Sequence, residues 1–213
     1  MAVMTLKQDL FSLSACLVLI MLYYLYLWQR TKRAPDSSAH RFNAKIRERW
    51  VQMILANNNN SLLAIQTIRN SVMAANFMAS TAILLIIGTL TSSEKLSQWL
   101  LNSELQNLIP AYTNELASIK LGLLVLDFFI AFYSFSMAIR FFNHVGYMIG
   151  LADIELTQQT TRYLNKAGRY YTLGTRSFFF SLPIILWLFG PYFLILGTLI
   201  LILGLALLDN VAN

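Results

Sequence analysis

The chain has 213 residues, of which 57% are hydrophobic and only 12% are charged, and its formal net charge is +6. A soluble domain carries about 25% charged residues, and a soluble protein of this length exposes too much surface to hide so many apolar side chains. The composition therefore indicates a protein in lipid. Nucleic acid is not an expected partner, because the basic residues flank apolar runs, where such residues orient membrane proteins.

Four apolar segments are long enough to cross a membrane, since about 20 helical residues span a hydrocarbon layer of about 30 Å. They cover residues 10–28, 72–90, 119–142 and 177–208. The first is predicted to be a retained anchor, because its basic cluster follows the apolar run, whereas in a signal peptide it precedes it. We predict an all-α, polytopic integral membrane protein: one membrane domain over residues 1–213, built as a four-transmembrane-helix bundle with short amphipathic loop helices.

Lysine and arginine are unevenly distributed between the loops. Thirteen of the sixteen lie in or beside residues 29–71 and 143–176, and the other three lie in the N-terminal tail and in or beside residues 91–118. By the positive-inside rule, the first two loops are cytoplasmic. We therefore expect the bacterial inner (cytoplasmic) membrane, with both termini and the 91–118 loop outside the cytoplasm.

The fourth segment, 177–208, is longer than one crossing needs. Its residues would form a helix of about 48 Å. We expect one tilted helix that is kinked at Gly190-Pro191. A hairpin turning at the same pair is the alternative and would place the C-terminus inside. It is disfavoured because no polar group near the turn would satisfy the exposed backbone.

Three loop segments have helical patterns of their own. Thr91–Glu94 has capping-box spacing and predicts a short external helix towards Leu108, and Asp153 is the expected N-cap of a helix that ends near Lys166. Residues 40–55 are amphipathic, with apolar residues at helical spacing and four basic residues mostly on the other faces. Those basic residues are candidate contacts for anionic lipid headgroups: Arg41, Lys45, Arg47 and Arg49. Packing of this helix on its own bundle is an equally good expectation.

Small residues at regular spacing mark the surfaces on which membrane helices pack. The second segment has Ser71, Ala75, Ala79 and Ala82 on one face. The fourth has Gly190, Gly197 and Gly204 at seven-residue spacing, after Pro183. We expect these stripes to pack helices within a tight bundle, an oligomer or both, and a pore lining is the less favoured alternative.

Asp127 is the ionisable residue that lies well inside an apolar segment. Such a residue is costly in lipid and faces a partner, a cavity or a pathway. It shares a face with Ala131, Ser134 and Ala138, whereas Asn76 lies nearer the other side of the membrane. Asp127, Asn76 and Ser134 form the candidate intramembrane polar site. A protonated Asp127 that hydrogen-bonds a neighbouring helix is preferred to a proton or cation site.

No catalytic motif, cofactor motif or metal-ligand spacing occurs in the sequence. We therefore expect a non-enzymatic protein that acts as a structural or accessory subunit of a homo-oligomer or a larger membrane complex. Its expected partners are membrane lipids, including anionic headgroups, and its own copies or other membrane subunits. The alternative is a small oligomeric channel or transporter with Asp127 near the path.

Three stretches carry a family resemblance: residues 71–81 with Phe-Met-Ala-Ser-Thr at their end, residues 120–143 ending in Arg-Phe-Phe-Asn, and residues 167–180 with Trp187 and Pro191 beyond. They resemble a family of small integral membrane proteins from bacteria and plants that is known only as a domain of unknown function. The resemblance implies membrane location and helix count, and no activity. The family pattern has a lysine where this chain has Ser134, no acid at Asp127, and His-Phe-Asn at residues 170–172. A chemical role shared by those family residues is therefore in doubt for this chain.

Overall fold

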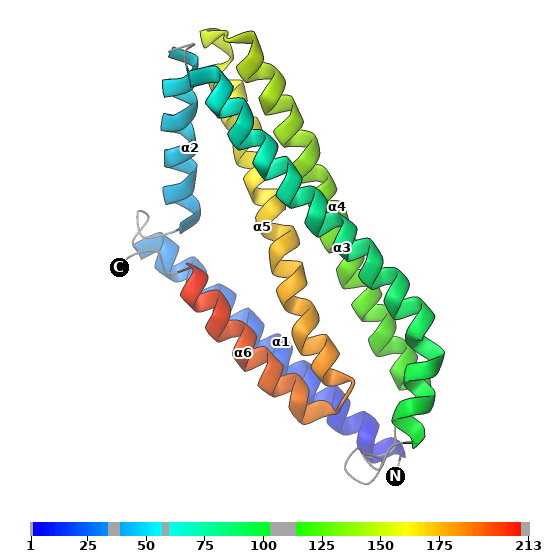
Figure 1. Ribbon diagram of the computed structural model, residues 1–213. Coiled ribbons are helices and arrows are strands. Elements are labelled where there is room, and N and C mark those ends of the chain that lie inside the picture. The colour runs from blue at the N-terminus through cyan, green and yellow to red at the C-terminus, as the bar shows by residue number, and fades with distance from the viewer. Residues whose placement is uncertain (1, 34–38, 57–59, 103–113, 210–213) are drawn as a thin grey trace.

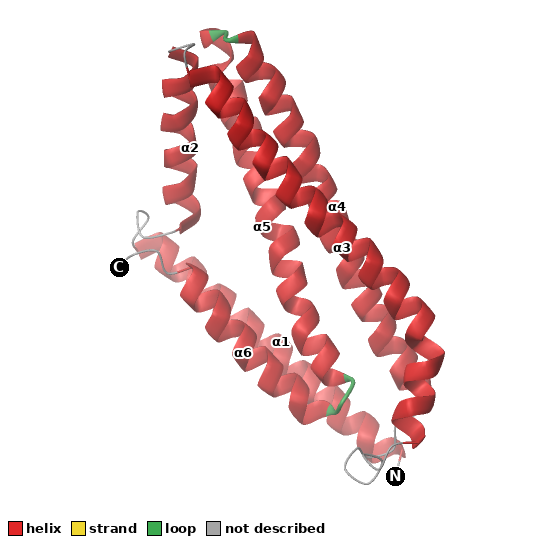
Figure 2. Ribbon diagram, viewed as in Figure 1, coloured by secondary structure: helices red, strands yellow, loops and turns green. Residues whose placement is uncertain are grey.

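The computed structural model describes residues 2–33, 39–56, 60–102 and 114–209, and all the regular structure in those ranges is helical (Figure 2). The helices are α1 (Ala2–Arg33), α2 (Ala39–Ala56), α3 (Ser61–Asn102), α4 (Asn114–Leu151), the short 3-10 helix η4 (Ile154–Leu156), α5 (Thr157–Trp187) and α6 (Pro191–Asp209). The all-α prediction is confirmed for this part of the chain.

Three of these helices are long and apolar enough to cross a membrane, over Lys7–Arg30, Ser61–Ser92 and Ala117–Leu151. The apolar part of α6, Pro191–Leu207, is shorter. With 42 and 38 residues, α3 and α4 are each roughly 60 Å long, about twice the thickness of a hydrocarbon layer. Both helices must therefore extend beyond the lipid.

Figure 1 shows α3, α4 and α5 packed side by side, with α2 against one half of α5 and the α1–α6 pair against the other half. The pair is parallel, because Cys16 packs with Leu194 and, further along both helices, Tyr23 packs with Leu201. The end of α6 therefore lies beside the end of α1.

The segment expected to form one kinked helix is two helices instead. α5 ends at Trp187 and α6 begins at Pro191, and α6 runs back along α5 (Figure 1). Gly190 has φ +146°, a conformation that side chains with a Cβ rarely adopt, and Pro191 suits the first position of the new helix. The prediction of a single helix over 177–208 is wrong, and the hairpin is the observed arrangement.

The turn is tolerated because a polar group from another helix reaches it. Lys120 Nζ of α4 donates to the carbonyl oxygen of Trp187, at 3.1 Å. The backbone N–H of Gly190 donates to the same oxygen at 3.2 Å. The objection that nothing near the turn could satisfy its backbone therefore fails, since the missing donor comes from a residue far away in the sequence.

Two expected loop helices are continuous with longer ones. α3 runs through Thr91–Glu94 to Asn102 without a break, so the expected helix start there is wrong. The end that was expected for this loop helix, near Leu108, lies outside the described residues. Asp153 does accept a hydrogen bond from the Glu155 N–H, at 2.9 Å, but it caps η4, and α5 then continues to Trp187. The helix of residues 154–166 and the start of the fourth apolar segment thus belong to one structural unit.

The buried core is divided along the bundle. One end, which we call the head, contains α2, the start of α3, the end of α4, η4 and the first half of α5. Its core consists of the following side chains: Val51, Ile54, Leu55, Ala64, Ile68, Ala138, Phe142, Val145, Ile149, Leu164 and Ala167. Further along, the alanine stripe of α3 packs on Ala131 and Phe135 of α4, so these small residues do serve close packing within the chain.

The glycines of α6 have different surroundings. A Cβ on Gly197 would lie 2.9 Å from Leu186 Cδ1 and 3.0 Å from Pro183 Cα, so this glycine allows α6 to approach α5 closely. Gly204 is exposed, and a Cβ there would have nothing within 4 Å. Together with Gly190 in the turn, the three glycines do not form one uniform packing surface.

Candidate functional site

One face of α4 carries three polar residues at seven-residue spacing, Lys120, Asp127 and Ser134. This spacing keeps side chains on one slowly drifting face of a helix. Lys120 and Ser134 are buried and Asp127 is half-buried. Because α4 packs closely on α5, each of these groups lies where it can contact the neighbouring helix or its own backbone.

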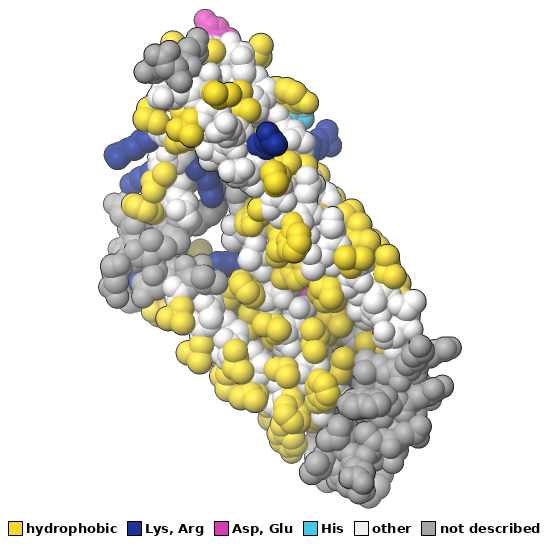
Figure 3. All heavy atoms as spheres, in the orientation of Figure 1, with side chains coloured by type: hydrophobic (Ala, Val, Ile, Leu, Met, Phe, Trp, Pro, Cys, Tyr) yellow, Lys and Arg dark blue, Asp and Glu magenta, His cyan; other side chains and the backbone are white. Residues whose placement is uncertain are grey.

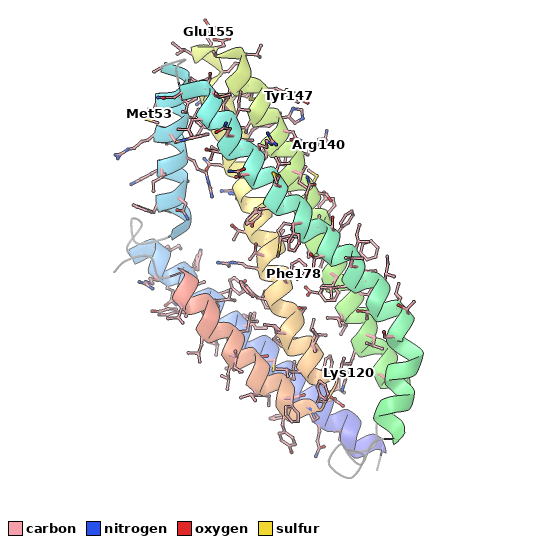
Figure 4. All side chains as sticks on the ribbon, viewed as in Figure 1. Met53, Lys120, Arg140, Tyr147, Glu155 and Phe178 are labelled. Carbon is pink, nitrogen blue, oxygen red and sulfur yellow. The ribbon has the colours of Figure 1, made fainter. Side chains whose placement is uncertain are left out.

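At the end of the bundle opposite the head, Lys120 belongs to a buried polar cluster. We call Asp9, Lys120 and Trp187 the base cluster; Figure 4 labels Lys120 beside the α5–α6 turn. Lys120 Nζ lies 3.2 Å from Asp9 Oδ1, and Trp187 Nε1 donates to the same oxygen at 2.6 Å. The Lys120 ammonium also lies 4.8 Å from the centre of the Trp187 ring. The cluster joins α1, α4 and α5.

The members of the base cluster offset the cost of burying one another's charged and polar groups. An isolated charge removed from water is costly, and a buried ion pair is stable only when further hydrogen bonds satisfy its remaining groups. Asp9 has two donors on one oxygen. Lys120 also donates to the carbonyl oxygen of Trp187, the last residue of α5, where the helix dipole stabilises a positive charge. The cluster is therefore suited to holding helices together.

Asp127 contacts Ser177 of α5. Ser177 Oγ lies 2.9 Å from the carbonyl oxygen of Asp127 and 2.6 Å from its Oδ1. A serine hydroxyl has a single hydrogen and cannot donate fully to both oxygens. The Ser177 hydroxyl is therefore shared between the backbone and the side chain of Asp127. This contact joins α5 to α4.

The other oxygen of Asp127, Oδ2, is buried and has no hydrogen-bond partner. In a neutral acid this oxygen is a carbonyl group, which is cheaper to leave unpaired than one that carries negative charge. Chemically, it could also accept a proton, or a cation together with Ser177.

The other two members of the predicted polar site do not join Asp127. Asn76 is exposed on α3, so it faces away from the interior. Ser134 is fully buried, but its hydroxyl donates to the carbonyl oxygen of Ile130 in its own helix, at 2.7 Å. Of the three predicted residues, Asp127 alone contacts a polar side chain of another helix.

The four basic residues predicted to contact lipid headgroups also separate. Arg41, Lys45 and Arg49 are exposed on α2, whereas Arg47 is half-buried and its Nη1 lies 3.4 Å from Asn165 Oδ1 of α5. α2 packs on the bundle through Val51, Ile54 and Leu55. The apolar residues Phe42 and Ile46, near its start, remain exposed.

Sequence reasoning missed the base cluster. Asp9 precedes the first apolar segment and Lys120 begins the third, so each had the signature of an ordinary charge at a membrane edge. A usable signal was present, since one acid and one base each lie near the start of a helix, and the two helices run in the same direction. No sequence pattern, however, indicates that α1 and α4 both contact Trp187.

The described ranges contain no group of three or more His, Cys, Asp or Glu side chains placed to hold a metal ion. Compared with known proteins, residues 11–213 match a family described as protein of unknown function, DUF599. No curated protein and no solved structure matches the chain.

Proposed function

The chain belongs to the DUF599 family, whose function is unknown, and we propose that it is a non-enzymatic integral membrane protein that serves as a structural or accessory subunit. In this proposal the protein lies in the cytoplasmic membrane of a bacterium. There it is part of a homo-oligomer or of a larger membrane complex. The head, which carries most of the basic residues, lies in the cytoplasm, as the positive-inside rule requires.

In this arrangement α1, α3, α4 and the α5–α6 hairpin are embedded in lipid. α6 is parallel to α1, so the C-terminus lies on the same side as the end of α1, which is the cytoplasmic side. This replaces the expectation of an external C-terminus, which depended on a single helix over 177–208.

The observation that carries the proposal is an apolar surface at the tip of the head. Leu62 and Leu63 at the start of α3 are 69% and 64% exposed, and Leu151 and Ile154 at the end of α4 and in η4 are 70% and 67% exposed. In the proposed topology these residues lie beyond Arg69 and Arg140, on the water side of the membrane. Exposed apolar residues gathered in water mark a surface for another protein.

Purification in mild detergent tests this role, with partners identified by mass spectrometry. The double variant Leu151→Ser, Ile154→Ser should lose partners that the parent protein retains. Gln158→Ser, an exposed polar position of the same head, is the matched control and should keep them. Partners that survive the double variant unchanged would contradict the assignment of the tip as the contact surface.

A second candidate function has one observation in its favour. The buried, unpartnered Oδ2 of Asp127 is the kind of group found on proton and cation paths, and Ser177 beside it could serve as a second ligand. This supports a small channel or transporter. The hydrogen bonds from Ser177 to Asp127, which join α5 to α4, support the structural role instead.

A further inference from the structure

Arg47 differs from the other basic residues of α2 in how its side chain is held. A Cβ built on Gly168 of α5 would lie 2.6 Å from Cζ and Nη2 of Arg47 and 2.7 Å from Nη1. Because the three distances are nearly equal, the guanidinium plane lies flat over Gly168. Only glycine leaves room for this contact, so the orientation of the guanidinium is set by the packing of α2 on α5.

The donors of this guanidinium are largely unused. It has five N–H groups, and its hydrogen bond to Asn165 Oδ1 is long, at 3.4 Å. Burial lowers the pKa of Arg47, and no carboxylate in the described part of the chain offsets that effect. An arginine stays charged even so, and a half-buried charge without a counterion is unfavourable. The edge of the guanidinium therefore favours an anion.

Polar side chains lie along the face of α5 that Arg47 contacts. Thr161 shares the α5 face of Asn165 and Gly168, and its Oγ1 is buried without a hydrogen-bond partner. Figure 3 shows a hollow between α2, α5 and the α1–α6 pair, with Lys or Arg side chains above and below it. Further along α5, Arg176 lies over the Tyr24 ring of α1, at 5.9 Å from its centre. Basic side chains thus come from two neighbouring helices, Arg47 from α2 and Arg176 from α5.

We propose that Arg47 binds a phosphate group in this hollow, supplied by an anionic phospholipid headgroup or by a soluble phosphate compound. A planar guanidinium with its edge free matches two phosphate oxygens at once. At the end of α1, which precedes α2 in the chain, Lys32 stacks on Trp28 at 3.6 Å, an aromatic and basic pairing typical of the headgroup level. This inference does not depend on the partner-binding role of the head.

The proposal differs from general attraction of α2 to anionic membranes. In general attraction every basic residue of α2 contributes about equally, and the position of each charge matters little. In a specific site, Arg47 contributes far more to phosphate binding than Arg49 does. Displacing the Arg47 guanidinium then abolishes phosphate binding even though the positive charge is kept. Gly168→Ala makes that displacement, because its new Cβ would overlap the guanidinium.

The test uses the full-length protein in nanodiscs of phosphatidylcholine with a minor fraction of phosphatidylglycerol. Native mass spectrometry counts the phosphatidylglycerol molecules retained by each chain after extraction. Arg47→Gln and Gly168→Ala should weaken retention about tenfold or more, as expected for a lost charge-assisted pair. Arg47→Lys keeps the charge without the planar fork and should also weaken it. Arg49→Gln, the matched control on the same helix, should change it less than about twofold.

A second arm titrates inorganic phosphate against the parent protein. Competition with phosphatidylglycerol assigns the site to soluble phosphate, and retention of the lipid assigns it to the headgroup; either result supports a phosphate site at Arg47. Equal losses in Arg47→Gln and Arg49→Gln would overturn the proposal, as would binding of neither probe. If Gly168→Ala fails to fold by circular dichroism, Arg47→Lys decides the question.

Discussion

Lys120 of α4 and Asp9 of α1 form an ion pair inside the protein, with 3.2 Å between Nζ and Oδ1 and at most 8% of either side chain exposed. Trp187 completes the cluster at the point where the chain turns from α5 into α6. One set of side chains therefore fixes both the position of α1 and the turn of the hairpin.

Removing one partner of this pair should destabilise the protein. Lys120→Met leaves the Asp9 carboxylate buried without its cation, at a cost of about 3–5 kcal/mol. Lys120→Met combined with Asp9→Asn should recover much of that loss, because no charge is then left unpaired. Unfolding in detergent, followed by circular dichroism, measures both effects. Lys7→Met, at an exposed position on the same helix as Asp9, is the control. If Lys120→Met destabilised the protein no more than Lys7→Met, the ion pair would be unimportant for stability.

Substitution by leucine should affect stability differently at the two glycines within α6. Gly197→Leu forces atoms into Leu186 and Pro183, so it should separate α6 from α5 and lower the melting temperature by several degrees. Gly204→Leu meets open space and should leave folding intact. Its effect on oligomer distribution, seen by crosslinking, reports whether that face contacts another subunit. Equal stability of the two variants would mean that α6 does not pack closely on α5.

The sequence predicted helix content, the apolar segments and the buried orientation of Asp127 and Ser134 because these follow from local composition and helical spacing. It could not predict the hairpin. The decision between a kink and a turn at Gly190-Pro191 depends on Lys120, which reaches the turn from a different helix. The inward orientation of Arg47 was missed for the same reason, since it depends on the absence of a side chain at Gly168.

The hairpin gives a topology that differs from the one expected from the sequence. A reporter fused after the last residue should be active only in the cytoplasm, because α6 ends beside the end of α1. A reporter inserted near residue 58, between α2 and α3, should also be active only there, and serves as the internal reference. Activity of the C-terminal reporter outside the cytoplasm would contradict the hairpin in the membrane.

We propose that the buried polar groups of α4 join helices and do not conduct ions. Ion flux through proteoliposomes, followed with a pH dye or an ion dye, tests this proposal. We expect no flux above protein-free liposomes. We also expect Asp127→Asn to fold and assemble nearly as the parent does, because asparagine still hydrogen-bonds Ser177 for about 1 kcal/mol. Flux in the parent protein that disappears in Asp127→Asn would contradict the claim and make the channel the leading function.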